Sequence, residues 1–431
     1  MAVSGRLALV VLAGAVAVVL APTRQTVLLW VLVALALAVA DALLAVSPRR
    51  LRIEREPVPA VRLGEGASSA LLVTNPTGRT LRAVVRDAWQ PSAGPAGDRH
   101  TLRVKGGERR RVSTPLRPTR RGDRLADRVT VRSFGPLRLG ARQRSFEVPG
   151  AIRALPPFDS RKHLPSRLAS LRELDGRSAV RTRGQGTEFD SLRDYVEGDD
   201  VRSIDWRATA RRRSVVVRTW QPERDRRVIL VLDTSRTSAG RVGDQPRLDA
   251  AMDAALLLAA LASRAGDRVD FLAGDRWIRA RVAAAANRTT LLAELVQAMA
   301  PLEPALLEAS WPTLASAITD TSRRRSLVVL LTPLEPAAVL ESLLPTIATL
   351  THHHRVVLAS VSDPGLDEMA RTRQSTQDAY DAAAAERTIA LRERAAAVLT
   401  RLGVDVIDAP PHALPPRLAD HYLVLKSQGL L

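Results

Sequence analysis

The sequence predicts a multidomain protein in which a two-helix transmembrane hairpin and a small β-sandwich precede a doubly wound α/β domain. A chain of 431 residues is too long for one ordinary domain. Two apolar runs lie near its amino end, and its carboxyl half alternates apolar strands with helices. The expected divisions are 1–50 for the hairpin, 51–155 for the sandwich, 156–226 for a connector and 227–431 for the α/β domain.

The hairpin is predicted from the run Leu7 to Ala21, a turn containing Pro22, and a second run from Val27 to Val46. The second run has about the length needed to cross a ~30 Å hydrocarbon core. Asp41 interrupts it near one end, where we expect the carboxylate to reach the headgroups.

Flanking charges predict the orientation of this hairpin. One arginine, Arg24, lies in the connecting turn, whereas four follow the second run: Arg49, Arg50, Arg52 and Arg55. The positive-inside rule then places both termini and the soluble domains in the cytoplasm.

The segment 51–155 alternates apolar and polar residues, as in Leu81–Arg86 and Arg128–Arg132, between turn signals such as Asn75–Gly78. This period is typical of half-buried strands and predicts a β-sandwich that acts as a stalk or spacer.

The segment 227–431 predicts a parallel sheet covered by helices on both faces. The expected strands are Val228–Leu232, Arg268–Ala273, Ser326–Leu331, Val356–Ser362 and Val404–Ile407. The expected helices are Arg247–Ala265, Leu291–Met299, Leu314–Thr321, Ala337–Leu350, Ala379–Leu402 and Pro416–Ser427. Functional crevices of such sheets lie beyond the carboxyl ends of the strands, where Asp233 is expected.

Asp233, Ser235 and Thr237 stand at alternate positions and offer three oxygens on one loop. Mg²⁺ or Mn²⁺ accepts such ligands together with retained water, so the loop is a candidate cation site. The alternative is that Asp233 caps the next segment and the hydroxyls satisfy backbone groups of the turn.

A dense mixed-charge run extends from Gly198 to Arg211. The pair Asp199 and Asp200 could bind metal or transfer protons, but neighbouring arginines favour ionised, paired carboxylates. We therefore expect a salt-bridge network that locks the connector onto the α/β domain, with Trp206 as a packing anchor. A partner-docking surface is the alternative, and a hydrolase is the least favoured interpretation.

Composition excludes several classes. The chain has no cysteine, which excludes disulfide scaffolds and thiolate sites. Its net charge of +19 is almost wholly arginine, without the motifs of nucleic-acid binding. No phosphate-binding loop or common hydrolase motif occurs, so we expect no nucleotide and no enzymatic activity. His352–His354 is expected to be a polar helix-to-strand turn.

The chain resembles a bacterial membrane-anchored family known as domain of unknown function 58. Its hallmark occurs here as Gly184, Gly186, Glu188, Phe189, Arg193, Tyr195, Gly198, Asp199, Asp200, Arg202, Ile204, Asp205, Trp206, Ala210 and Arg211. The carboxyl half also resembles a von Willebrand factor A domain, with Asp233, Ser235 and Thr237 matching its metal-adhesion motif.

The resemblance implies a further ligand, Thr313, and an aspartate at a position occupied here by Pro333. Glu335 is displaced from that position by two residues, so weak metal affinity is implied, with dependence on a partner's acidic residue. It also implies a MoxR-type AAA+ ATPase as partner and no established catalytic activity.

These observations lead to the hypothesis of a non-enzymatic, membrane-tethered adaptor whose A-type domain contacts the ATPase or its client. The alternative is a scaffold of a cell-envelope assembly with a metal-free A-type domain and the β-sandwich as its working surface.

Overall fold

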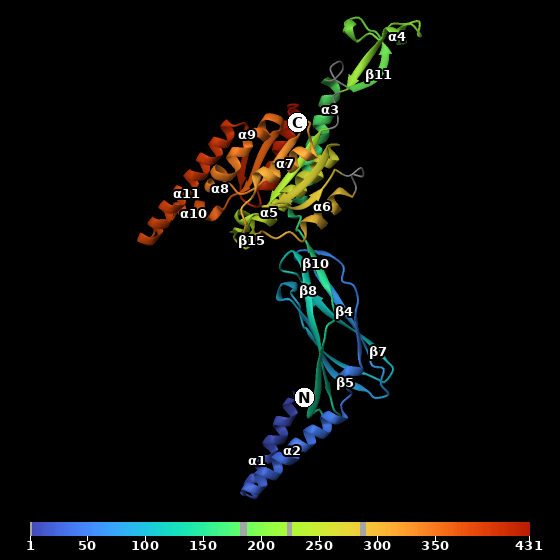
Figure 1. Cartoon of the computed structure of the whole chain (residues 1–431), viewed down its shortest axis with the longest axis vertical. Coiled ribbons are helices and arrows are strands. Elements are labelled where there is room, and N and C mark those ends of the chain that lie inside the picture. The colour runs from blue at the N-terminus through green and yellow to red at the C-terminus, as the bar shows by residue number, and fades with distance from the viewer. Residues whose placement is uncertain (1, 182–187, 222–225, 285–289) are drawn as a thin grey trace. The chain divides into compact units, whose positions relative to one another are not determined.

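The computed structural model describes residues 2–181, 188–221, 226–284 and 290–431. The chain forms two compact units, Met1–Leu155 and Pro156–Leu431. It is a multidomain protein that combines helices with mixed β-sheets (Figure 1).

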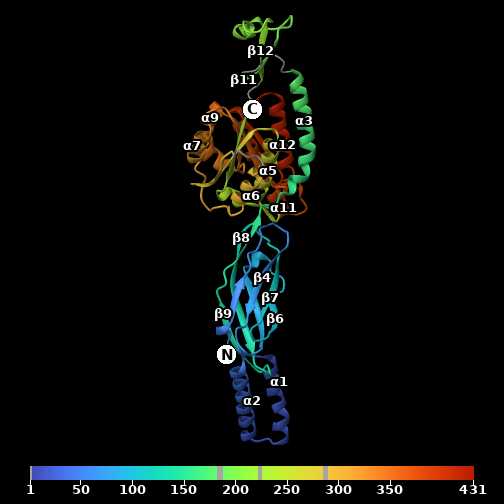
Figure 2. The ribbon, with the colours of Figure 1, turned by 90° about the vertical axis from the view of Figure 1, so that its right-hand side faces the viewer.

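The first unit begins with strand β1 (Ala2–Val3) and two apolar helices, α1 (Gly5–Leu20) and α2 (Arg24–Leu44). The helices lie side by side (Figure 2), and Trp30 Nε1 donates to the Val10 carbonyl at 3.0 Å. Within the described residues, the stretch Arg24–Arg50 alone is long and apolar enough to cross a membrane, with a mean hydropathy of 2.7. Helix α1 is shorter.

The rest of this unit consists of two sheets around a shared core. The strands are β2 (Arg52–Arg55), β3 (Val61–Arg62), β4 (Ala67–Thr74), β5 (Leu81–Trp89), β6 (Arg99–Val104), β7 (Arg109–Leu116), β8 (Gly122–Phe134), β9 (Gly140–Phe146) and β10 (Ala151–Leu155). One sheet has the order β2-β4-β7, and the other, of seven strands, is built around β5, β8 and β9. Alternating strand residues such as Leu71, Val85 and Val131 form the core between them.

A buried ion pair joins the two sheets. Arg55 of β2 donates from Nη2 to Asp87 of β5 at 2.7 Å, and the two side chains are 3% and 0% exposed. Trp89 Nε1 donates to the same carboxylate at 3.1 Å, and the Arg55 guanidinium lies 4.8 Å from the Trp89 ring. Loss of one member would leave a buried, unpaired charge, which typically costs about 3–5 kcal/mol.

Asp41 joins α2 to the turn between β8 and β9. The side chain is only 1% exposed, and its carboxylate accepts hydrogen bonds from the backbone N–H groups of Leu137 at 2.8 Å, Leu139 at 2.7 Å and Gly140 at 3.0 Å. A Cβ atom on Gly140 would lie 2.1 Å from the Ala38 carbonyl oxygen, so only glycine permits this approach. The expectation that Asp41 reaches the headgroups is wrong, because the β8–β9 turn satisfies the carboxylate.

The second unit contains a six-stranded sheet of order β17-β16-β13-β18-β19-β20. Its strands are β13 (Arg227–Asp233), β16 (Arg268–Gly274), β17 (Ile278–Val282), β18 (Leu327–Leu331), β19 (Arg355–Val361) and β20 (Val404–Ala409). Five of them are parallel, close to the expected bounds, but β17 pairs with β16 in the antiparallel direction. The prediction of a parallel sheet is therefore wrong at this edge. The connection from β16 to β17 spans only 275–277, too short for a crossover.

Helices cover both faces of this sheet (Figure 1). They are α5 (Arg247–Arg264), α6 (Leu291–Met299), α7 (Trp311–Thr321), α8 (Pro336–Ala338) with a π-helical turn (Val339–Leu343), α9 (Leu344–His353), α10 (Pro364–Arg371), α11 (Thr376–Arg401) and α12 (Leu414–Ser427). Helices α7, α9 and α11 share one apolar core with the sheet, and α5 packs against α12 on the other side. His352–His354 lies at the junction of α9 and β19.

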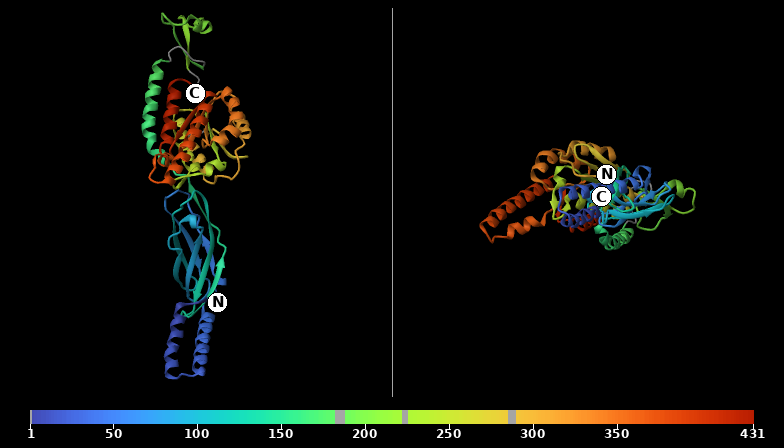
Figure 3. Two further views of the ribbon diagram at one scale, coloured as in Figure 1. Left: turned by 90° about the vertical axis from the view of Figure 1, so that its left-hand side faces the viewer. Right: turned by 90° about the horizontal axis from the view of Figure 1, so that it is seen from below.

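The connector contains regular structure that the sequence did not predict. Helix α3 (Leu164–Arg181) packs along α12 (Figure 3), and Arg167 forms a two-pronged ion pair with Asp420 at 2.9 Å. The signal was the three- and four-residue spacing of Leu164, Leu168 and Leu171, which charged neighbours obscured. The connector continues with the hairpin of β11 (Glu188–Asp194) and β12 (Val216–Gln221).

Replacing Asp41 with alanine should release the β8–β9 turn from α2. A hydrogen bond to a charged group contributes about 1.5–3 kcal/mol, and Asp41 accepts three. Hydrogen–deuterium exchange of the full-length protein in detergent should become faster at the Leu137, Leu139 and Gly140 amides. Asp98→Ala, which removes an exposed ion pair with Arg86, is the matched control and should leave these amides protected. Equal exchange in wild type and Asp41→Ala would contradict the assigned role.

Candidate functional site

The strand order of the six-stranded sheet creates a crevice between β13 and β18, where the chain connections turn to opposite sides of the sheet. Strand β13 pairs with β16 on one side and β18 on the other, and chain order reverses between β13 and β18. Ligands of open α/β sheets bind outside the carboxyl ends of the strands at such a point. Asp233 ends β13, and Thr332 directly follows β18 in the adjacent register.

Asp233 is the centre of a hydroxyl-rich network at this crevice. It is 1% exposed, and one carboxylate oxygen accepts from the Ser235 N–H at 2.7 Å. The other accepts from Thr332 Oγ1 at 2.7 Å and from Thr237 Oγ1 at 3.2 Å. The hydroxyls of Ser235 and Thr237 are 3.0 Å apart. The loop 233–237 thus has the compact geometry expected for an oxygen-rich site, and Thr332 adds a hydroxyl that the sequence did not single out.

Burial raises the pKa of the Asp233 carboxyl above its ordinary value, although the hydrogen bonds from Thr332, Ser235 and Thr237 oppose this effect. Among the described residues, no guanidinium or ammonium group forms an ion pair with Asp233. A buried carboxylate without a counter-charge is costly, so proton uptake or cation binding would relieve the same penalty.

The cavity beside Asp233 has a volume of about 10 Å³, roughly that of a single water molecule or ion. Glu308 and Trp311 line it together with residues of the π-helical turn Val339–Leu343. Glu308 also forms an ion pair with Arg236. The enclosed volume is small enough to suit an ion or a water molecule.

Thr313, the remaining predicted ligand, lies elsewhere. Thr313 is exposed at the start of α7, where its Oγ1 lies 2.8 Å from Ser310 Oγ, and it does not line the cavity. Glu335 accepts from Arg247 Nη1 at 2.7 Å instead of facing Asp233. Pro333 lines the cavity and offers no side-chain ligand.

The donor set fits one weakly held hard cation. It supplies one carboxylate and three hydroxyls, from Ser235, Thr237 and Thr332, while waters or a partner's carboxylate would complete the coordination. Among the described residues, no group of three His, Cys, Asp or Glu side chains could hold a metal. A cation bound at such a site would neutralise the Asp233 carboxylate and could bridge it to an anionic group of another molecule.

A second carboxylate supports the loop after Asp233. Asp275, 0% exposed, accepts from Thr234 Oγ1 at 3.0 Å and from Arg279 Nε at 2.8 Å. Burial acts to raise its pKa, but the hydrogen bonds from Arg279, Trp277 and Thr234 outweigh burial and lower it. The ionised Asp275 therefore fixes the position of Thr234, and with it the backbone of the candidate site.

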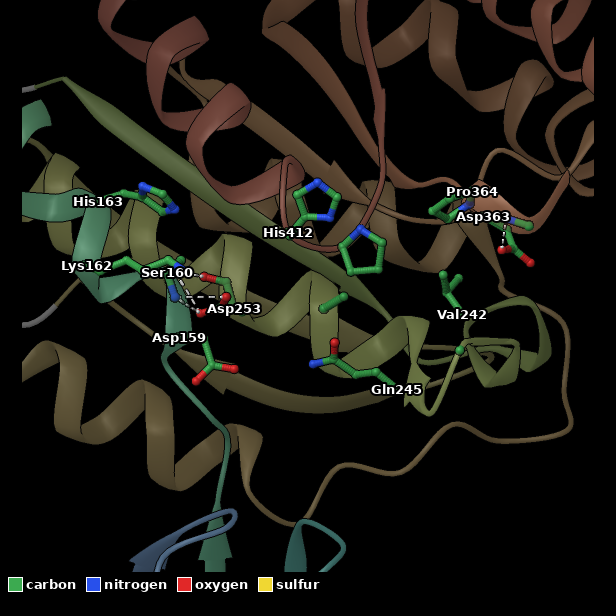
Figure 4. Close-up of a pocket in the computed structure, with 14 residues that line it drawn as sticks. Asp159, Ser160, Lys162, His163, Val242, Gln245, Asp253, Asp363, Pro364 and His412 are labelled. Atoms are coloured by element: carbon green, nitrogen blue, oxygen red, sulfur yellow. Dashed lines mark hydrogen bonds between the residues drawn. The ribbon is translucent and has the colours of Figure 1, made fainter. Parts of the chain in front are cut away.

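A larger cavity of about 590 Å³ lies in the same unit (Figure 4). Asp159, Lys162, His163, Asp253 and His412 are among the residues that line it. Ser160 Oγ donates to Asp253 at 2.7 Å, while burial raises the pKa of that carboxyl. Burial, followed by the charges of Arg167 and Lys162, lowers the pKa of His163. Cavities that bind small molecules have volumes of about 300–1,000 Å³, so this one can accommodate a polar ligand or a partner's side chains.

The Gly-Asp-Asp run forms a loop of the β11–β12 hairpin that its own carboxylates organise. Asp199 pairs with Arg193 and accepts from the Val196 N–H at 2.9 Å. Asp205 caps the short helix α4 (Trp206–Thr209) through the Ala208 N–H at 2.9 Å. Gly198, with φ of 106°, adopts a conformation that favours glycine.

Further contacts hold this loop in place. Asp205 also accepts from Arg218 Nε of β12 at 2.8 Å, and Asp200 accepts from the Arg202 N–H at 3.0 Å. The pKa of Asp199 is lowered first by Arg193, and that of Asp205 first by the Ala208 N–H and then by Arg218. These carboxylates are structural caps, which accounts for their spacing without catalysis.

The surface of this loop is apolar and exposed. Trp206 is 69% exposed, Val201 63% and Val196 60%. The prediction of Trp206 as a packing anchor is therefore wrong, because its side chain, at the start of the short helix α4, is mostly exposed to solvent. Tyr195 is half-buried, and Arg202 and Arg211 are exposed. Gly184 and Gly186 lie outside the described residues, as do the side chains of Glu188 and Phe189.

Comparison with known proteins identifies a family of unknown function. The family described as "Protein of unknown function DUF58" matches residues 191–396, which include most of the Gly-Asp-Asp loop and the Asp233 site. Uncharacterised proteins of Mycobacterium bovis and Mycobacterium tuberculosis are 30% identical over 185 residues. That region is 42% of this chain and 56% of the relatives, so the match spans little more than half of their length.

Solved structures resemble parts of the chain at low identity. The CARDB domain of PF1109 from Pyrococcus furiosus is 15% identical, and the match covers 23% of this chain and 94% of that domain, with a TM-score of 0.17. A FixG-related protein from Vibrio parahaemolyticus is 12% identical, with coverage of 24% and 96% and a TM-score of 0.16. Scores this low support no inference about function.

Asp233→Asn should change the pH dependence of stability. A carboxyl with a raised pKa contributes stability that is present below its unfolded pKa and lost as pH rises through its folded pKa. The melting temperature of wild type minus that of Asp233→Asn should therefore fall as the pH rises above the ordinary aspartate pKa of about 4, measured in the presence of a chelator. Thermal unfolding of the full chain measures this difference. A constant difference across the range would show that Asp233 does not titrate with a raised pKa.

Proposed function

We propose that this protein is a non-enzymatic, membrane-tethered adaptor that recruits another protein through its second unit. The partner that fits the resemblance in the sequence is a MoxR-like AAA+ ATPase or its client. ATP hydrolysis belongs to that partner, and this chain supplies position and recognition.

The exposed apolar surface of the Gly-Asp-Asp loop carries this proposal. Asp199 and Asp205 fix the loop through backbone and arginine contacts, yet Trp206, Val196 and Val201 remain open to solvent. A loop that is ordered by its own caps does not need these side chains for folding. Tryptophan and arginine are enriched among the residues that contribute most to protein interfaces, and Trp206 is followed in the sequence by Arg207.

The Asp233 site gives the contact a second, ion-dependent component. Its cavity of about 10 Å³ admits one ion, and the donor set of one carboxylate and three hydroxyls leaves coordination positions open. A carboxylate of the partner would fill such a position. The cation is Mg²⁺ or Mn²⁺, because both prefer oxygen ligands.

Anchorage follows from the apolar helices. We propose that α1 and α2 both cross the bilayer and that both termini and the soluble units lie in the cytoplasm. The length of α2, 21 residues or about 32 Å, and the arginines that follow it support this arrangement.

A scaffold role is the second candidate function, and Pro333 favours it. Pro333 contributes no carboxylate to the cavity lining, and the carboxylate of Glu308, which also lines it, is paired with Arg236. The domain could therefore bind its partner without metal. In that case the β-sandwich of the first unit would provide the working surface.

Trp206→Ala should weaken capture of the partner without unfolding the protein. Loss of an interface tryptophan costs at least about 2 kcal/mol, which corresponds to a roughly thirtyfold weaker affinity. Co-purification of tagged full-length protein from its native membrane measures the yield of the ATPase. Trp277→Ala is the matched control, since Trp277 is 55% exposed outside this loop. An equal yield with both variants and wild type would refute docking through Trp206.

Asp233→Ala should make partner capture insensitive to divalent cations. In the wild type, chelation should reduce the yield and Mg²⁺ should restore it, because the cation bridges Asp233 to the partner. The same co-purification with and without a chelator tests this. If the ATPase is captured equally by wild type and variant, the adaptor stands and the cation bridge fails. If envelope proteins replace the ATPase, the scaffold function takes precedence.

A further inference from the structure

We propose that the first unit binds one anionic phospholipid in a cavity between the start of α1 and the β5–β6–β8 sheet. The cavity has a volume of about 390 Å³. This inference rests on the membrane anchorage in the proposed function, but not on the adaptor role.

The cavity lining combines cationic side chains, which complement a phosphate, with apolar side chains, which complement an acyl chain. Three arginines contribute to it, Arg6 from α1, Arg82 from β5 and Arg138 from the β8–β9 turn. The apolar part of the lining comes from Leu9, Ala83, Val84 and Phe134. Guanidinium groups bind phosphate oxygens in paired geometry, and the apolar wall can accept the first part of an acyl chain.

The charges of these arginines are not neutralised within the protein. None of the three forms an ion pair with a carboxylate of the described residues, and the cavity lining contains no acidic side chain. Arg82 Nη1 donates to the Pro136 carbonyl at 3.2 Å, a contact that orients the side chain but leaves its charge intact. Asp41, on the inner side of the β8–β9 turn, is occupied by three backbone N–H groups. An anion is therefore the complementary ligand.

The backbone holds Arg138 in an unusual conformation. Among the described residues, Arg138 is the one residue other than glycine with positive φ, at 59°. Ser4 fixes it by donating from its hydroxyl to the Arg138 carbonyl, while the Ser4 N–H donates to the Leu139 carbonyl at 3.1 Å. Such conformations persist where the surrounding structure imposes them, and they are concentrated at ligand sites.

The position of the cavity selects a lipid over a soluble anion. Arg6 lies in the first turn of α1, and Leu9, one turn further along, is 66% exposed. Strand β1, which directly precedes α1, pairs with β9 of the same β-sheet whose β8–β9 turn contacts Asp41 of α2. The cavity therefore opens at headgroup depth, where phosphate and acyl carbons are adjacent.

Binding of phosphatidylglycerol to the purified full-length protein in detergent tests the proposal. Phosphatidylglycerol should raise the melting temperature saturably, and phosphatidylcholine should not. Arg82→Gln combined with Arg138→Gln should require about 25-fold more phosphatidylglycerol for the same shift, since each arginine near an anionic lipid contributes roughly a fivefold effect.

Two further variants separate the site from general charge and from misfolding. Arg103→Gln with Arg110→Gln removes the same charge from exposed strand positions outside the cavity and should bind as wild type. Thr101→Trp fills the cavity without altering charge and should abolish the shift. Each variant must first melt like the wild type without lipid.

Three outcomes would overturn the lipid site. They are equal shifts with phosphatidylcholine, an equal loss in the Arg103 and Arg110 control, or a full shift with inorganic phosphate alone, which would indicate a free-anion site. Membrane fractionation of the wild type tests the proposed anchorage separately from the phospholipid site. A wild type absent from the membrane pellet contradicts anchorage, whereas a membrane-bound wild type without lipid preference contradicts only the phospholipid site.

Discussion

The carboxylate of Asp41 is the contact on which the organisation of the first unit depends. It is the point at which an apolar helix is joined to a β-sheet, and it satisfies three backbone N–H groups of one turn at once. The same turn presents Arg138, and Arg79 donates to the carbonyl of Leu44 at the end of α2. The end of α2, the β8–β9 turn and these two arginines are thus held together by a connected set of contacts.

Carboxylates that accept hydrogen bonds from backbone N–H groups recur at each candidate site of this chain. Asp233 accepts a hydrogen bond from the Ser235 N–H, Asp199 from the Val196 N–H and Asp205 from the Ala208 N–H. In a chain with 64 Lys and Arg but only 45 Asp and Glu, acidic groups are the scarcer partner. Their placement at loop ends therefore determines where the backbone turns, and the excess arginines remain available for external anions.

The sequence predicted the elements whose burial determines their composition. Strands β13 and β18 are apolar along their length because helices cover both faces, and Asp233 follows directly from the end of β13. Strand β17 was missed because it is an edge strand that is largely exposed. Nothing in the sequence distinguishes Thr332 from other threonines, because only the pairing of β13 with β18 brings its hydroxyl to Asp233. Asp41 was misinterpreted because its partners lie 96 to 99 residues away.

The joint at Asp41 also has a thermodynamic consequence. Since it lies within one helical turn of the end of α2, this contact joins the β-sheets of the first unit directly to that helix. In the membrane-anchored arrangement proposed above, tumbling of these sheets relative to the bilayer normal would be restricted before any encounter takes place. Association normally requires loss of translational and rotational freedom, and in that arrangement part of the loss would precede binding. A molecule confined to the same bilayer would approach these sheets from a narrow range of directions.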